Sequence, residues 1–192
     1  MPVTVIRAST VHGEGAARPR EWMFIKRALE RRPAVFLAPG GVGIDHTTAA
    51  VNTAALIERV AAVPGSRILN SADPDAPTAL QITRAIAAHF TQFTWYDHVW
   101  EEILLDESQD SAADPSLGGH PGDARPPIIL NTTASVDLGY VPVGTFAETI
   151  PDEINWLLFL DRVGFTPGAG DPFFGPLLDY TAEDRYLAAR TD

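Results

Sequence analysis

The chain has 192 residues, 45% of them hydrophobic and 20% charged, so it can bury one ordinary core and is not a disordered tail. Its 25 acidic residues outnumber 14 scattered basic ones, giving a formal net charge of −11, which argues against a nucleic-acid partner. The lack of cysteine excludes disulfides, thiolate zinc sites and a cysteine nucleophile, and the lack of a membrane-length apolar run or signal-peptide pattern predicts a soluble, cytoplasmic protein without membrane contact.

Strands and helices alternate along the chain, which favours an α/β architecture. A strand of the buried type is predicted at residues 3–6, and it runs directly into a loop over residues 7–15. Because such a strand normally lies in the middle of an α/β protein, we expect the chain to be a later portion of something larger. The other predicted elements, in chain order, are a helix at 20–31, a strand at 35–37 entering the turn Pro39-Gly40-Gly41, a helix at 51–62, a strand at 67–70, a helix from the N-cap Thr78 through Phe90, and a helix at 145–163.

Two segments lack a helical or strand pattern. Residues 108–127 are acidic and rich in Gly, Pro and Ser, which predicts a long surface loop or a lid. After a first unit at residues 1–163, the tail at 164–192 carries Leu177, Leu178 and Tyr180, and we expect it to dock on the body.

An ordered series of short motifs resembles the C-terminal, substrate-binding half of the extended short-chain dehydrogenase/reductases, the NAD(P)-dependent epimerase/dehydratase family. The opening strand and its loop come first, and the series ends at Leu138-Gly139-Tyr140-Val141-Pro142. Between them lie His46-Thr47-Thr48-Ala49-Ala50-Val51-Asn52-Thr53, Ile68-Leu69-Asn70-Ser71-Ala72-Asp73 and Thr78. The resemblance implies late strands of a Rossmann-type sheet plus a small substrate-binding α/β subdomain. Physically, Gly139 suits a left-handed position after a short helix that Pro142 cannot continue.

The family's cofactor and catalytic motifs are missing from this chain. No glycines form the Gly-x-x-Gly-x-x-Gly loop that holds a pyrophosphate at a helix N-terminus. The only lysine, Lys26, has Trp22 four residues before it instead of the tyrosine of Tyr-x-x-x-Lys, and Tyr186 with Arg190 is not a close substitute. We therefore assign no catalytic residue. NAD or NADP is implied by the resemblance, but neither is expected to bind this chain alone.

The resemblance implies that Ala8 and Ser9 line the nicotinamide and that Thr10 contacts substrate. The alternative for Thr10 is an ordinary loop threonine. His46 occupies the place of a phosphate-binding arginine, and because histidine is a weaker, titrating partner, a diphosphate substrate is in doubt. The alternative for His46 is a structural histidine ahead of a helix.

Two further residues are candidates for substrate contact. His120 lies where relatives carry a substrate-binding arginine, although its polar loop also suits a solvent-exposed histidine. Trp22 could wall a substrate cavity, but its helical spacing with Ile25 and Leu29 is also typical of a core residue.

Other chemistries have weaker support in the sequence. No Gly-x-Ser-x-Gly elbow indicates a serine hydrolase, and the five histidines lack His-x-x-x-His or His-Glu-x-x-His spacing. Tyr96-Asp97-His98 with Glu101 and Glu102 is read as a structural or solvated segment, and Asp73-Pro74-Asp75 as a turn, so no metal site is predicted.

The resemblance thus implies hydride transfer on a hydroxyl- or carbonyl-bearing, sugar-like small molecule, with the hydride carrier and base supplied elsewhere. The expected protein partner is an N-terminal half or a second copy. The alternative is a non-catalytic module that uses the remnant cleft or an exposed apolar sheet edge to bind a partner.

Overall fold

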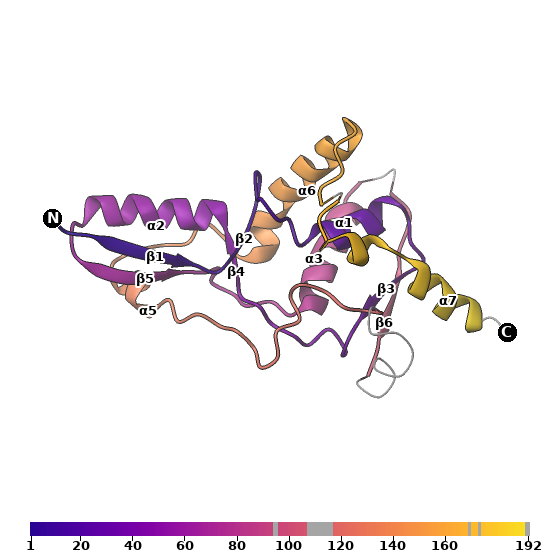
Figure 1. Cartoon of the computed structure of the whole chain (residues 1–192). Helices are drawn as coiled ribbons and strands as arrows, with labels where there is room; N and C mark the ends of the chain where they lie inside the picture. Colours follow the sequence, from indigo (N-terminus) through magenta and orange to yellow (C-terminus); the bar gives the residue numbers. More distant parts are fainter. Residues whose placement is uncertain (94–95, 107–116, 169, 173, 191–192) are drawn as a thin grey trace.

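The computed structural model describes residues 1–93, 96–106, 117–168, 170–172 and 174–190. The molecule is elongated, with β1, β5, α2 and α5 in one lobe, α1, α3, α6, α7, β3 and β6 in the other, and β2 and β4 between them (Figure 1). The strands are β1 Thr4–Ala8, β2 Thr10–His12, β3 Ala34–Leu37, β4 Thr47–Ala49, β5 Arg67–Ser71 and β6 Glu101–Leu104. The helices are α1 Trp22–Leu29, α2 Ala50–Ala62, α3 Ala79–Thr91, α5 Thr133–Asp137, α6 Phe146–Arg162, the 3₁₀ helix Gly175–Leu178 and α7 Thr181–Ala189.

The first lobe is a two-stranded parallel sheet with one covered face. β1 pairs with β5 from Thr4 opposite Arg67 to Ala8 opposite Ser71. Helix α2 and the segment after α5 cover one face with a small core that includes Leu56, Leu69 and Tyr140, with Ile6, Ala55, Val60 and Leu138 packed against it. The side chains that alternate with these are exposed, and they include Val5 at 49% and Ile68 at 60%.

Between the lobes, the strand that pairs with this part of the chain changes from β5 to β4. Ser9 still donates its backbone N–H to the carbonyl of Ser71, at 2.9 Å, whereas the N–H of Thr10 donates to the carbonyl of His46, at 3.2 Å. β2 then pairs in parallel with β4, from Thr10 opposite Thr47 to His12 opposite Ala49. Residues 9–13, which include β2 and are called the connecting loop below, therefore bridge the two lobes.

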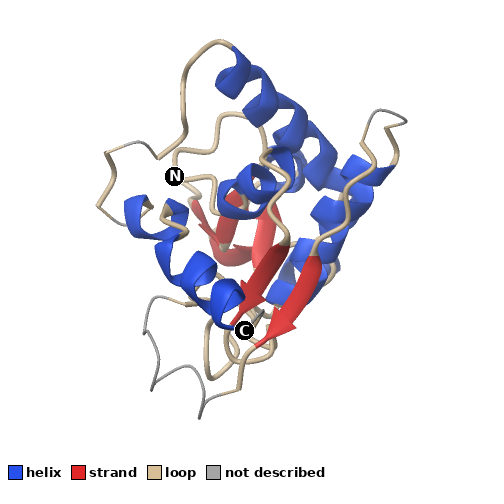
Figure 2. Cartoon of the chain, turned by 90° about the vertical axis from the view of Figure 1, so that its right-hand side faces the viewer, coloured by secondary structure: helices blue, strands red, loops and turns tan. Residues whose placement is uncertain are grey.

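The second lobe holds the larger core, where α1, α3 and α6 pack together. Its fully buried side chains come from all three helices: Trp22, Ile25, Ile86, Phe90, Ile154 and Leu157. Beside it, β3 pairs in parallel with β6, from Ala34 opposite Glu101 to Leu37 opposite Leu104. Figure 2 shows the strands lying among the helices of this lobe.

The C-terminal segment packs on the second lobe. Ala182, Tyr186 and Leu187 of α7 contact the apolar cluster around Phe36, and the Tyr186 and Phe36 rings meet edge to face at 5.3 Å. The buried guanidinium of Arg27 donates to Oε1 of Glu183 at 2.6 and 3.0 Å. An apolar contact and a buried ion pair therefore hold the tail.

The mixed α/β architecture is confirmed, and the long helices begin and end within about two residues of their predicted limits. Thr78 caps α3 as predicted, because its hydroxyl accepts from the N–H of Gln81 while the Gln81 side chain accepts from the N–H of Thr78. The turn at residues 39–41 is present, and Gly139 follows the short helix α5 with φ of +86°.

Other details differ from the sequence-based expectation. The first strand is not buried, because its outward-facing Val3 and Val5 are about half exposed. Strands β2, β4 and β6 and helix α7 were not predicted. Of the expected loop at 108–127, residues 108–116 lie outside the described residues, and 117–127 contain no helix or strand. Over the described part of the chain, no helix is both long and apolar enough to span a membrane.

Candidate functional site

A small cavity lies in the second lobe beside the connecting loop, and the space in it that a water-sized molecule can occupy is about 20 Å³, enough for one or two waters. It brings together two residues predicted for substrate contact, Thr10 and His120, which are 110 positions apart in sequence. Its lining comes from β2, β4 and the residue two before it, the start of α1 and the two residues preceding it, the first turn of α3, and the loop after residue 117: Thr10, Arg20, Glu21, Phe24, Asp45, Thr47, Ala79, Ile82, His120, Pro121 and Gly122.

The polar side of the cavity is built around Asp45. Its Oδ2 accepts a hydrogen bond from the Thr10 hydroxyl at 3.1 Å and also pairs with the guanidinium of Arg20. Arg20 donates a second hydrogen bond to the carbonyl of Pro121 at 3.2 Å. The positive charge at the cavity is thus already bound to a carboxylate.

His120 faces the cavity as a neutral group. Burial lowers the pKa of His120 to about 4, with Asp123 opposing the shift and Arg125 adding to it. Its ring lies 6.1 Å from the ring of Phe24. At neutral pH this histidine offers the cavity hydrogen-bonding nitrogens rather than a charge.

His46 lies beneath the cavity with its ring turned into the protein, and it is 4% exposed. Its Nε2 is 3.0 Å from the carbonyl oxygen of Asp73 and 2.9 Å from that of Asp75, while its Nδ1 accepts from the N–H of Leu130 at 3.1 Å. Because both ring nitrogens bond backbone groups, the side chain ties three segments together. Contact with substrate through this ring stays a prediction without geometric support.

The remaining predicted residues lie around the cavity rather than in it. Trp22 is fully buried in the core of α1, α3 and α6 and does not line the cavity. Ala8 is exposed at the end of β1, and Ser9 is partly buried with its hydroxyl donating to the carbonyl of His46. Their assignment to the nicotinamide stays a prediction.

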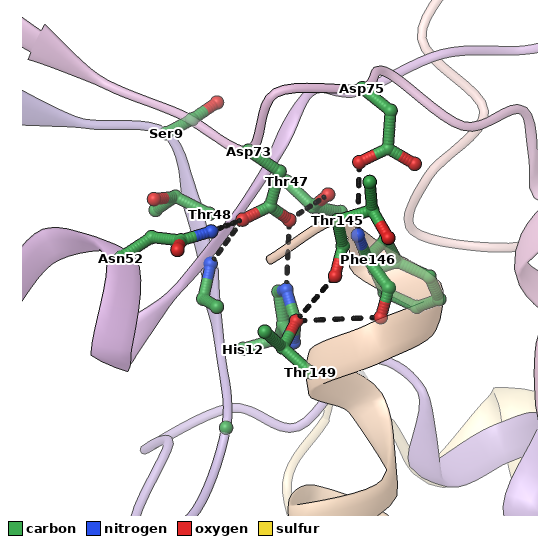
Figure 3. A network of polar contacts seen from close by, with 12 residues as sticks. Ser9, His12, Thr47, Thr48, Asn52, Asp73, Asp75, Thr145, Phe146 and Thr149 are labelled. Atoms are coloured by element: carbon green, nitrogen blue, oxygen red, sulfur yellow. Dashed lines mark hydrogen bonds and ion pairs between the residues drawn. The ribbon is translucent and has the colours of Figure 1, made fainter. Parts of the chain in front are cut away.

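A buried polar network under the cavity joins both lobes (Figure 3). The carboxylate of Asp73 accepts from the N–H of Ala49 and the amide of Asn52, each at 2.7 Å. Its other oxygen accepts from the Thr47 hydroxyl at 2.7 Å and lies 2.9 Å from Nε2 of His12. All of these side chains are at most 2% exposed.

The pKa values of two buried carboxyl groups, Asp73 of this network and the neighbouring Glu153, shift in opposite directions. Burial disfavours ionised Asp73, but the hydrogen bond and charge of His12, with the other donors, outweigh it and lower the pKa of Asp73 below its usual range. Burial, with the nearby Glu21 carboxyl, raises the pKa of Glu153 well above its usual range. Glu153 accepts from the N–H of Gly13 at 2.8 Å and so fixes the end of the connecting loop to α6.

Sequence reasoning did not single out Arg20, Glu21 or Asp45, and it placed Asp73 in a family-like motif and in a turn without giving it a functional role. One signal was available for Asp73: it follows β5 by two residues, at the carboxyl end of a parallel strand, where α/β proteins often place functional groups. The ion pair of Arg20 and Asp45 has no comparable sequence signal. Among the described residues, no cluster of His, Cys, Asp and Glu could hold a metal ion.

Neither protein-family models nor curated protein sequences match the chain. Solved structures do. UDP-glucuronic acid 4-epimerase from Bacillus cereus, in complex with UDP-glucuronic acid and NAD, matches with a TM-score of 0.59 and 14% identity over 83% of this chain and 46% of that one. UDP-glucose 4-epimerase from Thermus thermophilus, in complex with NAD, gives 0.56 and 17% over 80% and 45%. dTDP-glucose 4,6-dehydratase from Bacillus anthracis, in complex with NAD, gives 0.56 and 15% over 83% and 46%.

The chain shares the fold of part of the NAD-dependent epimerases and dehydratases. It spans less than half the length of each of these extended short-chain dehydrogenases. The fold expected from the resemblance in the sequence is therefore confirmed, whereas identities of 14–17% carry no assignment of substrate or reaction.

Proposed function

We propose that this chain supplies the substrate-binding half of an NAD(P)-dependent epimerase, dehydratase or reductase. A dinucleotide-binding half outside these 192 residues supplies the hydride carrier and the catalytic base. Two observations together carry the proposal. The chain matches the fold of 46% of a protein that was solved in complex with NAD, but its own sequence lacks both the glycine loop and Tyr-x-x-x-Lys. The implied reaction is hydride transfer between nicotinamide and a carbon bearing a hydroxyl or carbonyl in a sugar-like substrate.

The residues of this chain do not fit a dinucleotide pyrophosphate by themselves. A pyrophosphate site needs free N–H groups at a helix N-terminus. Here the N–H of Phe146 at the start of α6 donates to Asp75 at 2.9 Å, and α3 is closed by its own capping box. The N-termini of α3 and α6 are therefore occupied by groups of this chain. In the proposed assembly Ala8 and Ser9 face a nicotinamide held by the other half.

The bare face of the first lobe supports a docked partner. Parallel sheets are almost always covered on both faces, and a two-stranded sheet alone is marginally stable. Among the described residues β1 pairs only with β5, and Val5 and Ile68 face outward on the uncovered side. A second half that adds a strand to β1 and covers this face would complete the sheet.

The same surface favours the alternative function, a non-catalytic module that binds a partner through the exposed sheet. The two functions differ in whether the assembly binds a nicotinamide cofactor next to the connecting loop. A homo-oligomer is the alternative partner arrangement, and the cytoplasmic location stays a prediction.

The test is to isolate the tagged chain with its native partner, identify the partner by mass spectrometry, and measure NAD⁺ and NADP⁺ binding by calorimetry. We expect a partner with Gly-x-x-Gly-x-x-Gly and Tyr-x-x-x-Lys, cofactor binding by the complex, and none by the chain alone. Ile68→Lys should abolish the complex. Val163→Lys is the matched control, because both side chains are 60% exposed.

Micromolar cofactor binding by the chain alone would contradict the inference that this chain lacks a pyrophosphate-binding site. A partner without either motif, in a complex that binds no cofactor, would favour the non-catalytic module. Light scattering that shows only a second copy of this chain would favour the homo-oligomer.

A further inference from the structure

Four titratable side chains are buried together where the connecting loop meets α6. His12 lies on β2, Glu21 at the start of α1, Asp73 after β5 and Glu153 on α6, and each of the four is at most 4% exposed. Burying an ionised group costs free energy unless a partner offsets that cost. The contacts among these four groups therefore decide which of them carry protons.

The contacts of Asp73 fix which ring nitrogen of His12 bears a hydrogen. The carboxylate of Asp73 already accepts from three other donors, and its lowered pKa keeps it ionised near neutral pH. Nε2 of His12 lies 2.9 Å from Oδ2 of Asp73 and therefore donates to it (Figure 3). The second ring nitrogen, Nδ1, lies on the side of Glu153, 3.7 Å from its Oε2.

Two buried polar atoms at this point have no partner. Among the described residues, neither Nδ1 of His12 nor Oε1 of Glu153 makes a hydrogen bond. Oε2 of Glu153 accepts from the N–H of Gly13 at 2.8 Å. One proton would serve both groups after a small rotation of the carboxyl, because it makes either Glu153 a donor to Nδ1 or the imidazolium a donor to the carboxylate. Without that proton, the Nδ1 lone pair faces a carboxylate.

The surrounding charges also disfavour the pair without its proton. Burial, with the nearby Glu21 carboxyl, raises the pKa of Glu153 well above its usual range. Burial raises the pKa of Glu21 too, despite the opposing charges of His12 and Arg20. The guanidinium of Arg20 is itself bound to Asp45. An ionised Glu153 would therefore lie in a buried site beside a second carboxyl group.

We propose that His12 and Glu153 share one proton, that this proton holds the connecting loop on α6, and that its loss at higher pH releases Gly13. While the proton is present, Glu153 stays inside the protein and accepts from the Gly13 N–H. Once the proton is lost, the carboxylate turns toward water, and that N–H loses its acceptor. The loop that carries Thr10 thus responds to pH. The inference goes beyond the proposed function, because it needs neither a partner nor a cofactor.

A pH titration of the 192-residue chain by NMR tests the inference, from about pH 4 to about pH 9. It follows the side-chain carboxyl carbon of Glu153 and the backbone amide of Gly13. We expect the carboxyl carbon to titrate above the ordinary glutamate value of about 4.3, and the Gly13 amide shift to change with the same midpoint. Protection of this amide from hydrogen exchange, corrected for base catalysis, should fall about tenfold across that midpoint.

Substitutions separate the shared proton from other effects of pH. In Glu153→Gln the side-chain amide can donate to Nδ1 of His12 while its oxygen accepts from Gly13, and it does not titrate, so the Gly13 transition should disappear and the protection should remain. Glu21→Gln removes the neighbouring carboxyl and should move the transition to lower pH. Asp152→Asn is the matched control, since this exposed neighbour on α6 should leave the transition unchanged.

Three results would overturn the inference. They are a Glu153 carboxyl that titrates near the ordinary value of about 4.3, a Gly13 amide that does not respond while Glu153 titrates, and a Gly13 transition that persists in Glu153→Gln. The first two come from the unsubstituted chain, so they decide the question even if a variant fails to fold. Failure of the cofactor-binding assembly leaves all three measurements unchanged.

Discussion

Replacing Asp73 by alanine should be among the most damaging single changes in this protein. The carboxylate accepts hydrogen bonds from the N–H of Ala49, the amide of Asn52 and the hydroxyl of Thr47, and it lies within hydrogen-bond distance of His12. In Asp73→Ala the Thr47 hydroxyl can rotate, but the Ala49 N–H and the Asn52 amide lose this partner in a buried site. A buried polar group left unsatisfied costs about 1 to 3 kcal/mol, so the two groups together should cost about 2 to 6 kcal/mol.

Urea denaturation followed by circular dichroism measures this loss. Asp73→Asn keeps one oxygen for Ala49 and Asn52, and it should cost less, about 1 to 2 kcal/mol. Asp137→Ala, an exposed position on α5, is the control and should stay within about 0.5 kcal/mol of the unsubstituted protein. A loss below about 1 kcal/mol in Asp73→Ala would refute the view that this carboxylate holds the network together.

The same carboxylate predicts how stability responds to acid. Because the pKa of Asp73 is lowered on folding, its ionised form stabilises the protein at pH values above the unfolded pKa, which is about 3.9. That contribution is lost as the pH falls from about 4 through the folded pKa. The stability difference between the unsubstituted protein and Asp73→Asn should therefore shrink on acidification over that range. A constant difference would contradict the assigned hydrogen bonds.

Three further changes test other parts of the structure. Thr78→Ala removes the capping box of α3 and should cost about 1 kcal/mol in urea denaturation, with an unchanged value arguing against the cap. Glu183→Ala leaves the buried guanidinium of Arg27 without its carboxylate and should cost about 3 to 5 kcal/mol, so a neutral result would mean that the tail is not held there. Burial and Glu21 raise the pKa of Glu153, so its stabilising contribution is complete below about pH 4.3 and is lost as the pH rises through the folded value. Glu153→Gln should therefore gain stability relative to the unsubstituted protein as the pH rises above about 4.3, and denaturation curves showing no relative gain would contradict the buried carboxyl.

The helices were predictable because their signals are local. Thr78 and Gln81 lie one turn apart at the start of α3, and Thr145 and Glu148 form the same box at the start of α6. Each box fixes the helix start from four consecutive residues, and the apolar positions that follow repeat at helical spacing. Such patterns need no knowledge of the rest of the chain.

The strands that join the lobes carry no comparable signal. β2 and β4 are three residues long, and their pairing joins Thr10 to Thr47 across 37 positions. In β6 the two leading residues are glutamates, so no alternation of apolar and polar residues is visible. These strands exist because the fold brings the segments together, which single-sequence patterns do not describe.

Only part of the candidate site was predictable, because local motifs indicate some of its residues and long-range contacts bring in the others. Motif positions placed Thr10 and His120 near a substrate, and both line the cavity. His46 was chosen for its position in a motif, but its ring direction depends on the N–H of Leu130, 84 residues away. Arg20 and Asp45 carry no signal in the sequence, and only their contact in the folded chain places them at the cavity.

The proposed function places its strictest geometric requirement on the connecting loop. Ser9 bonds the strand neighbour of β1, in the lobe with the bare sheet, whereas the next residue, Thr10, lines the cavity of the other lobe. Consecutive Cα atoms are about 3.8 Å apart, and reacting atoms in hydride transfer must approach to about 3 to 3.5 Å. In the proposed assembly, a nicotinamide against Ser9 and a ligand against Thr10 would lie on two consecutive residues. Since Glu153 accepts from the N–H of Gly13, and Asp73 lies within hydrogen-bond distance of His12, the buried network holds β2 and the residue that follows it in place, so any ligand against Thr10 would meet a rigid backbone.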